Sequence, residues 1–273
     1  MWRQELGKDP GLGVSVHDMR SGGQVKGWSP WAPDVGHAVV LMRMGGFRRH
    51  ASGQDSFLDA AGGYVTSEGL EERFAYPSAG EIRYTWIALT PDAYDEHVAG
   101  VQGAPGWMLA ITALLDLRHR ELLSACRKGA DRLEVGERVQ SLLAALPPRT
   151  ERPGPGMPPT TRVIHRRMTV AVQEALSCGH LNDGVEDLAR LVGASPKHVG
   201  RIFRHVTGRT ISEYRNELRV RAVLEHLADG GAQLAELATM YGFADHAHLT
   251  RTVRKHLAET PSALRARLDP GEL

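Results

Sequence analysis

Apolar residues in the last third of the chain repeat at the spacing of amphipathic helices. The helix expected to start at Pro196 has an apolar stripe at positions i, i+3, i+4 and i+7, made of Val199, Ile202, Phe203 and Val206. Cations follow a second face of the same helix, namely Lys197, Arg201 and Arg204. The pattern predicts a helix that packs through one side and presents basic residues on another.

The same pattern occurs twice between residues 183 and 267. The first copy runs through Asp187-Leu-Ala-Arg-Leu-Val-Gly and the second through Glu236-Leu-Ala-Thr-Met-Tyr-Gly, an offset of 49 residues. Beyond the glycine the offset is 50 residues, and Arg251 and Arg254 repeat the two arginines of the first copy. A repeat of this length indicates a duplicated unit. Each copy predicts two short helices joined at a tight glycine turn, which is the outline of a helix-turn-helix.

Capping signals divide residues 161–268 into seven expected helices, with one leading helix and two three-part repeats that share a long helix. The leading helix is expected at 162–177 and the shared helix at 211–228. Polar side chains that accept amide hydrogens in a first turn mark the starts of the shared helix and of four others. These signals are Asp183 with Glu186, Ser195 before Pro196, Thr210 with Glu213, Asp245, and Thr260 before Pro261.

Short strands separated by turn residues are expected in the first third of the chain. They are expected at 14–16, 24–31, 37–44, 47–50, 56–59, 64–66, 73–76 and 82–89. Strands at this even spacing predict a β-sandwich or barrel. The fold class expected for the whole chain is therefore α+β and multidomain, with a β-rich domain followed by an all-α domain.

Two amphipathic helices and a proline-rich segment follow the strands. Apolar residues favour one side of a first helix after residue 105 and of a second helix that ends near residue 143. A helical hairpin over 105–146 either caps the barrel or offers a homodimer surface, and the pattern leaves both open. Six prolines and two glycines fill residues 147–160, which predicts a semi-extended linker. The expected division is 1–146, the linker 147–160, and 161–268.

Composition describes a globular chain of 273 residues, 42% hydrophobic and 24% charged, with enough apolar content for a core. The net charge is +1, yet residues 161–268 hold 16 lysines and arginines against 11 acidic residues. This basic excess permits nucleic-acid binding. Cys126 and Cys178 have no paired spacing, which favours a reducing compartment. We expect no signal peptide, no membrane contact and a cytoplasmic location.

Residues 183–267 resemble the DNA-binding domain of the AraC/XylS family of bacterial transcription regulators. The second copy carries the match in Ala235-Glu-Leu-Ala, Tyr241-Gly-Phe, Leu249-Thr-Arg, Arg254-Lys and Thr260-Pro-Ser. In that family one long helix holds two helix-turn-helix units, which enter successive segments of the major groove. A helix over 211–228 would be about 27 Å long, compatible with reading helices about 34 Å apart. The resemblance implies double-stranded promoter or operator DNA as the partner, and RNA polymerase is a further candidate.

The resemblance also implies roles for side chains on both units. Base-reading positions fall on Lys197, Gly200, Arg201, His246, Ala247, His248 and Arg251. Phosphate contacts fall on Arg204, Arg209, Thr210, Arg254 and Lys255. Arginine can hold guanine through two hydrogen bonds, whereas Gly200 has no side chain to read a base. The two surfaces differ, which predicts an asymmetric DNA site. Ala258 replaces the glycine that the family places at a turn.

Residues 37–89 are similar to the cupin-type sensor domain that precedes this DNA-binding domain in many members of the family. The similarity is carried by Gly63-Tyr-Val and by residues 68–77. Metal-binding cupins use two histidines one residue apart, and His37, His50 and His97 lack that spacing, so we expect no metal and no cofactor. A small effector would fit between the sheets. The candidate pocket residues are Arg43, Arg48, Tyr64 and Trp86.

The leading hypothesis is a sequence-specific DNA-binding transcription regulator, controlled by a small effector or by dimerisation through the N-terminal domain. The alternative is a cupin-type enzyme with an auxiliary helical domain, but the sequence shows no metal ligand set, nucleophile elbow or phosphate loop. DNA-repair chemistry would need an activated cysteine, and both cysteines lie in apolar helical contexts. A regulator without a small ligand is a third reading that the sequence leaves open.

Overall fold

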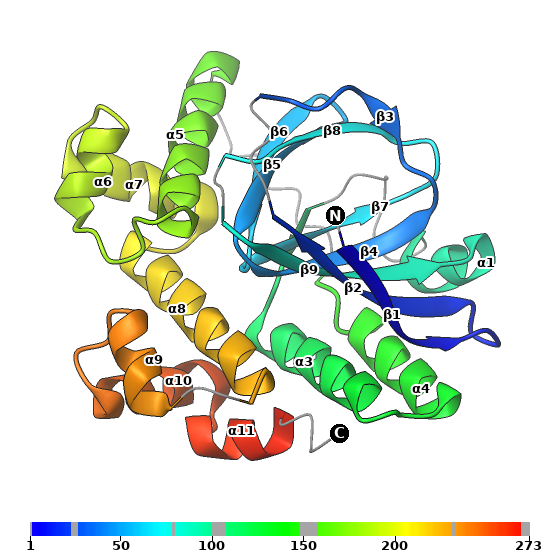
Figure 1. The fold of residues 1–273 in the computed structure, drawn as a ribbon. Coiled ribbons are helices and arrows are strands. Elements are labelled where there is room, and N and C mark those ends of the chain that lie inside the picture. The colour runs from blue at the N-terminus through cyan, green and yellow to red at the C-terminus, as the bar shows by residue number, and fades with distance from the viewer. Residues whose placement is uncertain are drawn as a thin grey trace.

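The computed structural model describes residues 2–22, 27–77, 80–99, 108–147, 158–230 and 233–268. Two β-sheets form the N-terminal part, a helical hairpin packs beside them, and seven helices follow within the described residues (Figure 1). This confirms the expected α+β class. The expected linker falls at residues 148–157 on positions outside these ranges.

The larger sheet has six antiparallel strands in the order β1-β2-β9-β4-β7-β10. Its strands are β1 Trp2–Asp9, β2 Val14–Ser21, β4 His37–Met44, β7 Gly62–Thr66, β9 Ile82–Leu89 and β10 Met108–Ala110. Strand β1 was not expected, because its residues are mostly polar and it lies at an exposed edge. Strand β10 lies where a helix was expected, and that expectation was wrong. Met108 pairs with Tyr64 of β7, and the helix begins only after Thr112.

The smaller sheet has four strands in the order β3-β8-β5-β6, namely β3 Ala32–Pro33, β8 Glu71–Ala75, β5 Gly46–Ala51 and β6 Gln54–Asp59. Of the strand expected at 24–31, residues 27–31 are irregular, and 23–26 lie outside the described ranges. The two sheets enclose an apolar core. It contains Met19, Ala38, Val40, Met42, Phe47, Leu58, Tyr64, Ile82 and Tyr84.

A second core lies between the outer face of the large sheet and the helices beside it. These elements are α1 Pro91–Tyr94, the π-helix η1 Asp95–Ala99, α3 Ala113–Arg127 and α4 Arg132–Leu143. Val39 and Leu41 of β4 pack there with Leu115, Leu122 and Val139 of the hairpin. The hairpin therefore caps the barrel, and α3 also packs against the last two helices of the chain (Figure 1).

The C-terminal helices follow the expected order. They are α5 Pro159–Ser177, α6 Val185–Leu191, α7 Pro196–Thr207, α8 Ile211–Ala228, α9 Leu234–Met240, α10 His246–Leu257 and α11 Pro261–Leu268. Ser195, Thr210, Asp245 and Thr260 accept first-turn amide hydrogens as predicted. The cap of α6 is shifted by one residue, because Gly184 is the N-cap and donates its amide hydrogen to Asp187.

Helix α8 joins two separate cores, one for each repeat. The first unit packs α5, α6 and α7 against the start of α8, and the second packs α9, α10 and α11 against its end (Figure 1). The N-terminal part contributes to both. Ala60 and Ala61 of the β6–β7 turn enter the first core, and Leu117 of α3 enters the second. Helix α8 is thus the strut that joins the two repeats, and the barrel and hairpin also pack beside it.

Candidate nucleic-acid interface

Helix α7 is held by its apolar stripe and leaves its cations exposed. Val199, Ile202 and Phe203 are each 1% exposed, which fixes the helix against the first core, whereas Val206, the fourth residue of the expected stripe, is 37% exposed. The helix starts at the Ser195 cap and ends at Gly208, whose positive φ of 77° suits glycine. Three cationic side chains are exposed on the opposite side, those of Lys197, Arg201 and Arg204.

Helix α10 repeats this arrangement in the second unit. Leu249 and Val253 are fully buried, and the side chains of His246, Arg251, Arg254 and Lys255 are exposed. The N-cap Asp245 accepts the amide hydrogen of His248 at 2.6 Å. The ring of His248 also accepts the amide hydrogen of Ala244 through Nδ1, at 3.2 Å. Only its Nε2 edge is left to face a ligand, so His248 both shapes the turn and borders the reading surface.

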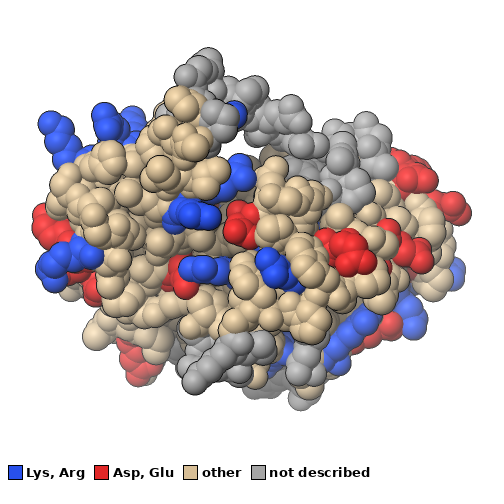
Figure 2. All heavy atoms as spheres, turned by 90° about the horizontal axis from the view of Figure 1, so that it is seen from above, with Lys and Arg blue, Asp and Glu red and all other residues tan. Residues whose placement is uncertain are grey.

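The two reading surfaces differ in detail. A side chain at Gly200 would meet no atom within 4 Å, so the residue leaves an open notch between Lys197 and Arg204. Arg201 contacts His198 at 3.3 Å, which draws part of its guanidinium along the helix. Figure 2 shows basic side chains projecting at the end of the molecule that α6 and α7 occupy in Figure 1, where acidic side chains also lie.

The predicted phosphate contacts fall into two groups. Arg204, Arg254 and Lys255 are exposed. Arg209 is instead paired with Glu217 of α8, and the Thr210 hydroxyl is engaged with Glu213 in the α8 cap. A phosphate would have to compete with these contacts. Arg209 and Glu217 also line a cleft of about 440 Å³ between the start of α3 and the ends of α7 and α10.

The structure separates the four candidate effector residues. Tyr64 is 2% exposed inside the barrel core, and Trp86 packs against that core. Arg43 and Arg48 face away from the barrel interior. Arg43 reaches Glu225 of α8, and Arg48 donates to Glu174 of α5 at 2.7 Å. The two arginines contact the C-terminal part and do not line a pocket between the sheets.

Polar residues inside the barrel were missed from the sequence. Arg49 lies over the Tyr64 ring at 4.2 Å and donates to Glu72 at 2.6 Å. Burial raises the pKa of Glu72 to about 7, even though the Arg49 guanidinium favours the ionised carboxylate. The alternation of side chains along a strand predicts these positions. Phe47 and Arg49 lie two residues apart on β5, so both side chains point into the barrel, and the side chain of Arg48 points away from it.

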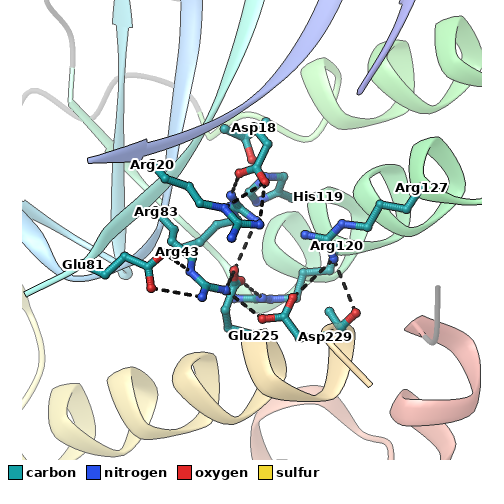
Figure 3. Close-up of polar contacts among 12 residues, drawn as sticks. Asp18, Arg20, Arg43, Glu81, Arg83, His119, Arg120, Arg127, Glu225 and Asp229 are labelled. Carbon is teal, nitrogen blue, oxygen red and sulfur yellow. Dashed lines mark hydrogen bonds and ion pairs between the residues drawn. The ribbon is translucent and has the colours of Figure 1, made fainter. Parts of the chain in front are cut away.

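A buried network between the two parts of the chain was also missed. The carboxylate oxygens of Glu225, in α8, lie 3.1 Å from the guanidinium of Arg43 in β4 and 2.8 Å from that of Arg120 in α3 (Figure 3). The guanidinium of Arg83, in β9, lies 3.6 Å from the same carboxylate. Asp18 completes the partners of Arg43. Burial alone would raise the pKa of Glu225, but the two nearest arginines outweigh it and hold the value at about 2.

No group of three or more His, Cys, Asp or Glu residues with metal-binding geometry occurs within the described ranges. In the same part of the chain, no helix has both the length and the apolar character needed to cross a membrane.

The two helix-turn-helix units, each with an exposed basic second helix, define a DNA-binding protein. A family of helix-turn-helix domains matches residues 188–267. The chain is 33% identical to the probable transcription factor PqrA of Proteus vulgaris over 86 residues, which cover 31% of this chain and 70% of PqrA. The chain belongs to the AraC-type family of helix-turn-helix transcription regulators, and it acts in transcription regulation by binding DNA.

Two further comparisons concern one curated relative and one solved structure. The bifunctional transcriptional activator and DNA repair enzyme AdaA of Bacillus subtilis is 28% identical over 81 residues, which cover 30% of this chain and 38% of AdaA. The crystal structure of ToxT from Vibrio cholerae O395 aligns over 94% of this chain and 98% of ToxT, with 9% identity. Its TM-score of 0.34 is too low to support a shared arrangement of the two parts.

Proposed function

We propose that the chain reads one asymmetric DNA site through α7 and α10 together. The observation that carries the proposal is the equivalence of the two helices. Each is held by a buried stripe, and each leaves arginines exposed at matching positions, Arg201 with Arg251 and Arg204 with Arg254. The proposed base contacts come from Lys197, Arg201, His246, His248 and Arg251. Arg204, Arg254 and Lys255 are the leading phosphate contacts, ahead of the engaged Arg209 and Thr210.

Selection of bound fragments from random double-stranded DNA tests this proposal. The expected result is one sequence with two unequal contacts about one helical turn, or about 34 Å, apart. The double variant Arg201→Ala with Arg251→Ala serves as the comparison, because it removes both proposed guanine contacts and leaves the buried stripes intact. Recovery of no common sequence by the wild-type chain would sink the proposal.

We further propose that a small effector enters the barrel near Tyr64 and Trp86. The support is the polar pair Arg49 and Glu72 beneath an otherwise aromatic and aliphatic core, an arrangement suited to orienting a small polar ligand. A thermal-shift screen of metabolites with the wild-type chain and with Arg49→Met tests the assignment. A ligand that stabilises both proteins equally would place the effector elsewhere.

Dimerisation through residues 105–146 is proposed only for the outer face of α4. Beyond its first turn, where Leu114 is 56% exposed, helix α3 is largely buried between the sheet, α4 and the second unit, whereas Leu133 of α4 is 63% exposed. Light scattering of the wild-type chain and of Leu133→Glu tests this surface, and an unchanged mass would remove it. RNA polymerase stays a candidate partner, and transcription reconstituted with purified polymerase would test that contact.

We infer that the chain is not an enzyme. Burial raises the pKa of the Cys126 thiol to about 11, the opposite of the shift that activates a nucleophilic cysteine. Methyl transfer from alkylated DNA to the protein, followed by mass spectrometry, tests the repair alternative. Methylation of Cys126 or Cys178 would overturn the inference.

The division into 1–146, a linker at 147–160 and 161–268 is likewise a proposal. It is supported by the separate cores of the barrel and of the two units, which share few residues across the boundary. Limited proteolysis should cut first between residues 147 and 160. Early cleavage inside α8 would contradict this division.

A further inference from the structure

Helix α8 carries a charged stripe that faces the N-terminal part of the chain. Glu217, Arg221, Glu225 and the C-cap residue Asp229 recur every four residues and therefore share one side of the helix. Arg221 and Glu225 are buried, at 2% and 1% exposure. A buried charged stripe on a helix is stable only where partners satisfy each charge.

The partners come from both the barrel and the hairpin. Arg221 donates to the carbonyl oxygens of Ala60, in the β6–β7 turn, and of Ile111, just before α3. Glu225 accepts from Arg43 of the barrel and Arg120 of the hairpin. Arg221 and Glu225 therefore attach α8, the strut between the two units, to the barrel and to the hairpin.

The last member of the stripe extends the same contact. The two carboxylate oxygens of Asp229 lie 2.7 Å from Nη1 of Arg83, in β9, and 3.8 Å from Nη1 of Arg127, in α3. Figure 3 shows the arginines of the barrel and of α3 converging on Glu225 and Asp229. Arg221, Glu225 and Asp229 thus all have partners from the N-terminal part, whereas Glu217, the first member of the stripe, pairs with Arg209 and Arg221 of the C-terminal part.

Contacts beyond the stripe tie the N-terminal part to each reading unit. Arg48 binds Glu174 in the first unit, and Glu121 of α3 pairs with Arg267 in the second. The barrel and hairpin therefore span the two units that α8 joins. Any rotation of one unit about the strut would have to break a contact at one of these ends.

The contacts that dock the N-terminal part on α8 leave the proposed reading surface exposed. Lys197, Arg201, His246, Arg251 and Arg254 are all exposed while the stripe is engaged. These contacts therefore do not block DNA by covering the reading residues. The docked arrangement is instead suited to holding two exposed helices in one relative orientation.

We propose that Glu225 is a positioning residue for DNA recognition. It ties the strut to the barrel and the hairpin at once, so that α7 and α10 meet the DNA at one fixed separation and rotation. This inference rests on the proposed function, in which both helices contact the same DNA site. Its signature is intolerance of a changed spacing between the two contacts, because one added base pair alters both their distance and their rotation.

The test uses the full chain and the DNA site selected by the wild-type protein. Binding is measured by fluorescence anisotropy on that site and on versions with one base pair added or removed between the contacts. The wild-type chain should lose about tenfold or more in affinity on the altered sites. Glu225→Gln should stay within about tenfold of wild type on the original site and lose about twofold or less on the altered ones. Glu134→Gln, which breaks a partly exposed pair with Arg138 on α4, should behave as wild type.

Each outcome has a distinct meaning. Unchanged spacing discrimination in Glu225→Gln would overturn the inference, and so would tighter binding to every site, which would show that docking restrains DNA binding. Failure of the wild-type chain to select any DNA would overturn the proposed function instead. If Glu225→Gln does not fold, Arg83→Met decides, because it removes a partly exposed partner of Glu225 and Asp229. Its discrimination between the original and the altered spacing should fall between that of the wild-type chain and that expected for Glu225→Gln. Discrimination as strong as that of the wild-type chain would overturn the inference.

Discussion

The hydroxyl group of Tyr214, at the start of α8, donates to the carboxylate of Asp59 at the end of β6, with oxygen–oxygen distances of 2.7 and 2.9 Å. Asp59 also accepts from the Ala61 amide and the Ser177 hydroxyl, each at 3.0 Å. Burial raises the pKa of Asp59, and these hydrogen bonds oppose the rise. The contact joins the barrel to the first DNA-reading unit through a buried acid.

Tyr214→Phe should destabilise the chain by about 1–3 kcal/mol. The ring would keep its edge contact with Phe203, at 5.3 Å between centroids, so the loss isolates the hydroxyl. Asp59 would then be buried with fewer donors. Denaturant unfolding measures the change. The matched control is Tyr241→Phe, at a partly exposed position in the second unit, which should cost less than about 0.5 kcal/mol.

Arg201→Ala and Arg251→Ala should each weaken binding to the selected site by about 1–3 kcal/mol, while binding to unrelated DNA changes far less. The reason is that base contacts carry discrimination, whereas phosphate contacts act on any sequence. Competition binding on both kinds of DNA measures the two effects. Arg190→Ala on α6 is the control, because this exposed arginine pairs with Asp187 away from the reading helices. Equal losses on both DNAs would remove the arginine from the base-reading set.

The helical units were predictable because their signals are local. An apolar stripe, a capping side chain and a turn glycine each act within a few residues, and the sequence repeats them at a fixed offset. Ser195, Thr210 and Asp245 cap the helices that their positions predicted. The cap of α6 was misplaced by one residue, since Asp183 pairs with His180 and leaves Gly184 as the N-cap.

The contacts between distant segments were not predictable in the same way. Arg43 and Glu225 are separated by 182 residues, and no local pattern pairs them. A stripe of alternating charges on α8 is typical of a solvent-exposed helix, so burial by the barrel reverses its usual interpretation. For Arg43 and Arg48, the error was to treat strand cations as pocket residues without first assigning the inward face of each strand.

Gly200→Ala should stabilise the chain by about 0.5–1 kcal/mol without changing sequence preference. The residue lies in the middle of α7, and a side chain there would meet no atom within 4 Å. Thermal unfolding and DNA selection measure the two properties. Gly242→Ala is the contrasting variant, because Gly242 has a positive φ of 68° and its added carbon would meet Asn182. That change should destabilise the chain, and stabilisation by both alanines would contradict the conformational argument.

Ala258→Gly should stabilise the second unit by about 1 kcal/mol. Ala258 ends α10 at a positive φ of 61°, the conformation that Gly208 adopts at the end of α7 with φ of 77°. A side chain is disfavoured there, whereas glycine adopts it freely. The reciprocal change, Gly208→Ala, should cost a similar amount. Thermal unfolding measures both, and the same sign of effect for the two variants would contradict the equivalence of the two caps.

Glu72 should make the barrel less stable as the solution changes from pH 5 to pH 8. Its pKa is about 7 in the folded chain, above the ordinary 4.5, so the folded state holds a proton that the unfolded state releases. The resulting stabilisation is fully present below about pH 4.5 and is lost as the pH rises through 7. The expected loss is on the order of 1–3 kcal/mol.

Comparison with Glu72→Gln isolates this effect. Burial lowers the pKa of His17 and His119, which adds stability above pH 6.5 and is common to both proteins. Glu225, with a pKa of about 2, stays ionised throughout this range. Subtracting the unfolding free energies of the variant from those of the wild type should therefore leave a difference that falls between pH 5 and pH 8. A flat difference would mean that Glu72 ionises in the folded barrel as readily as in the unfolded chain.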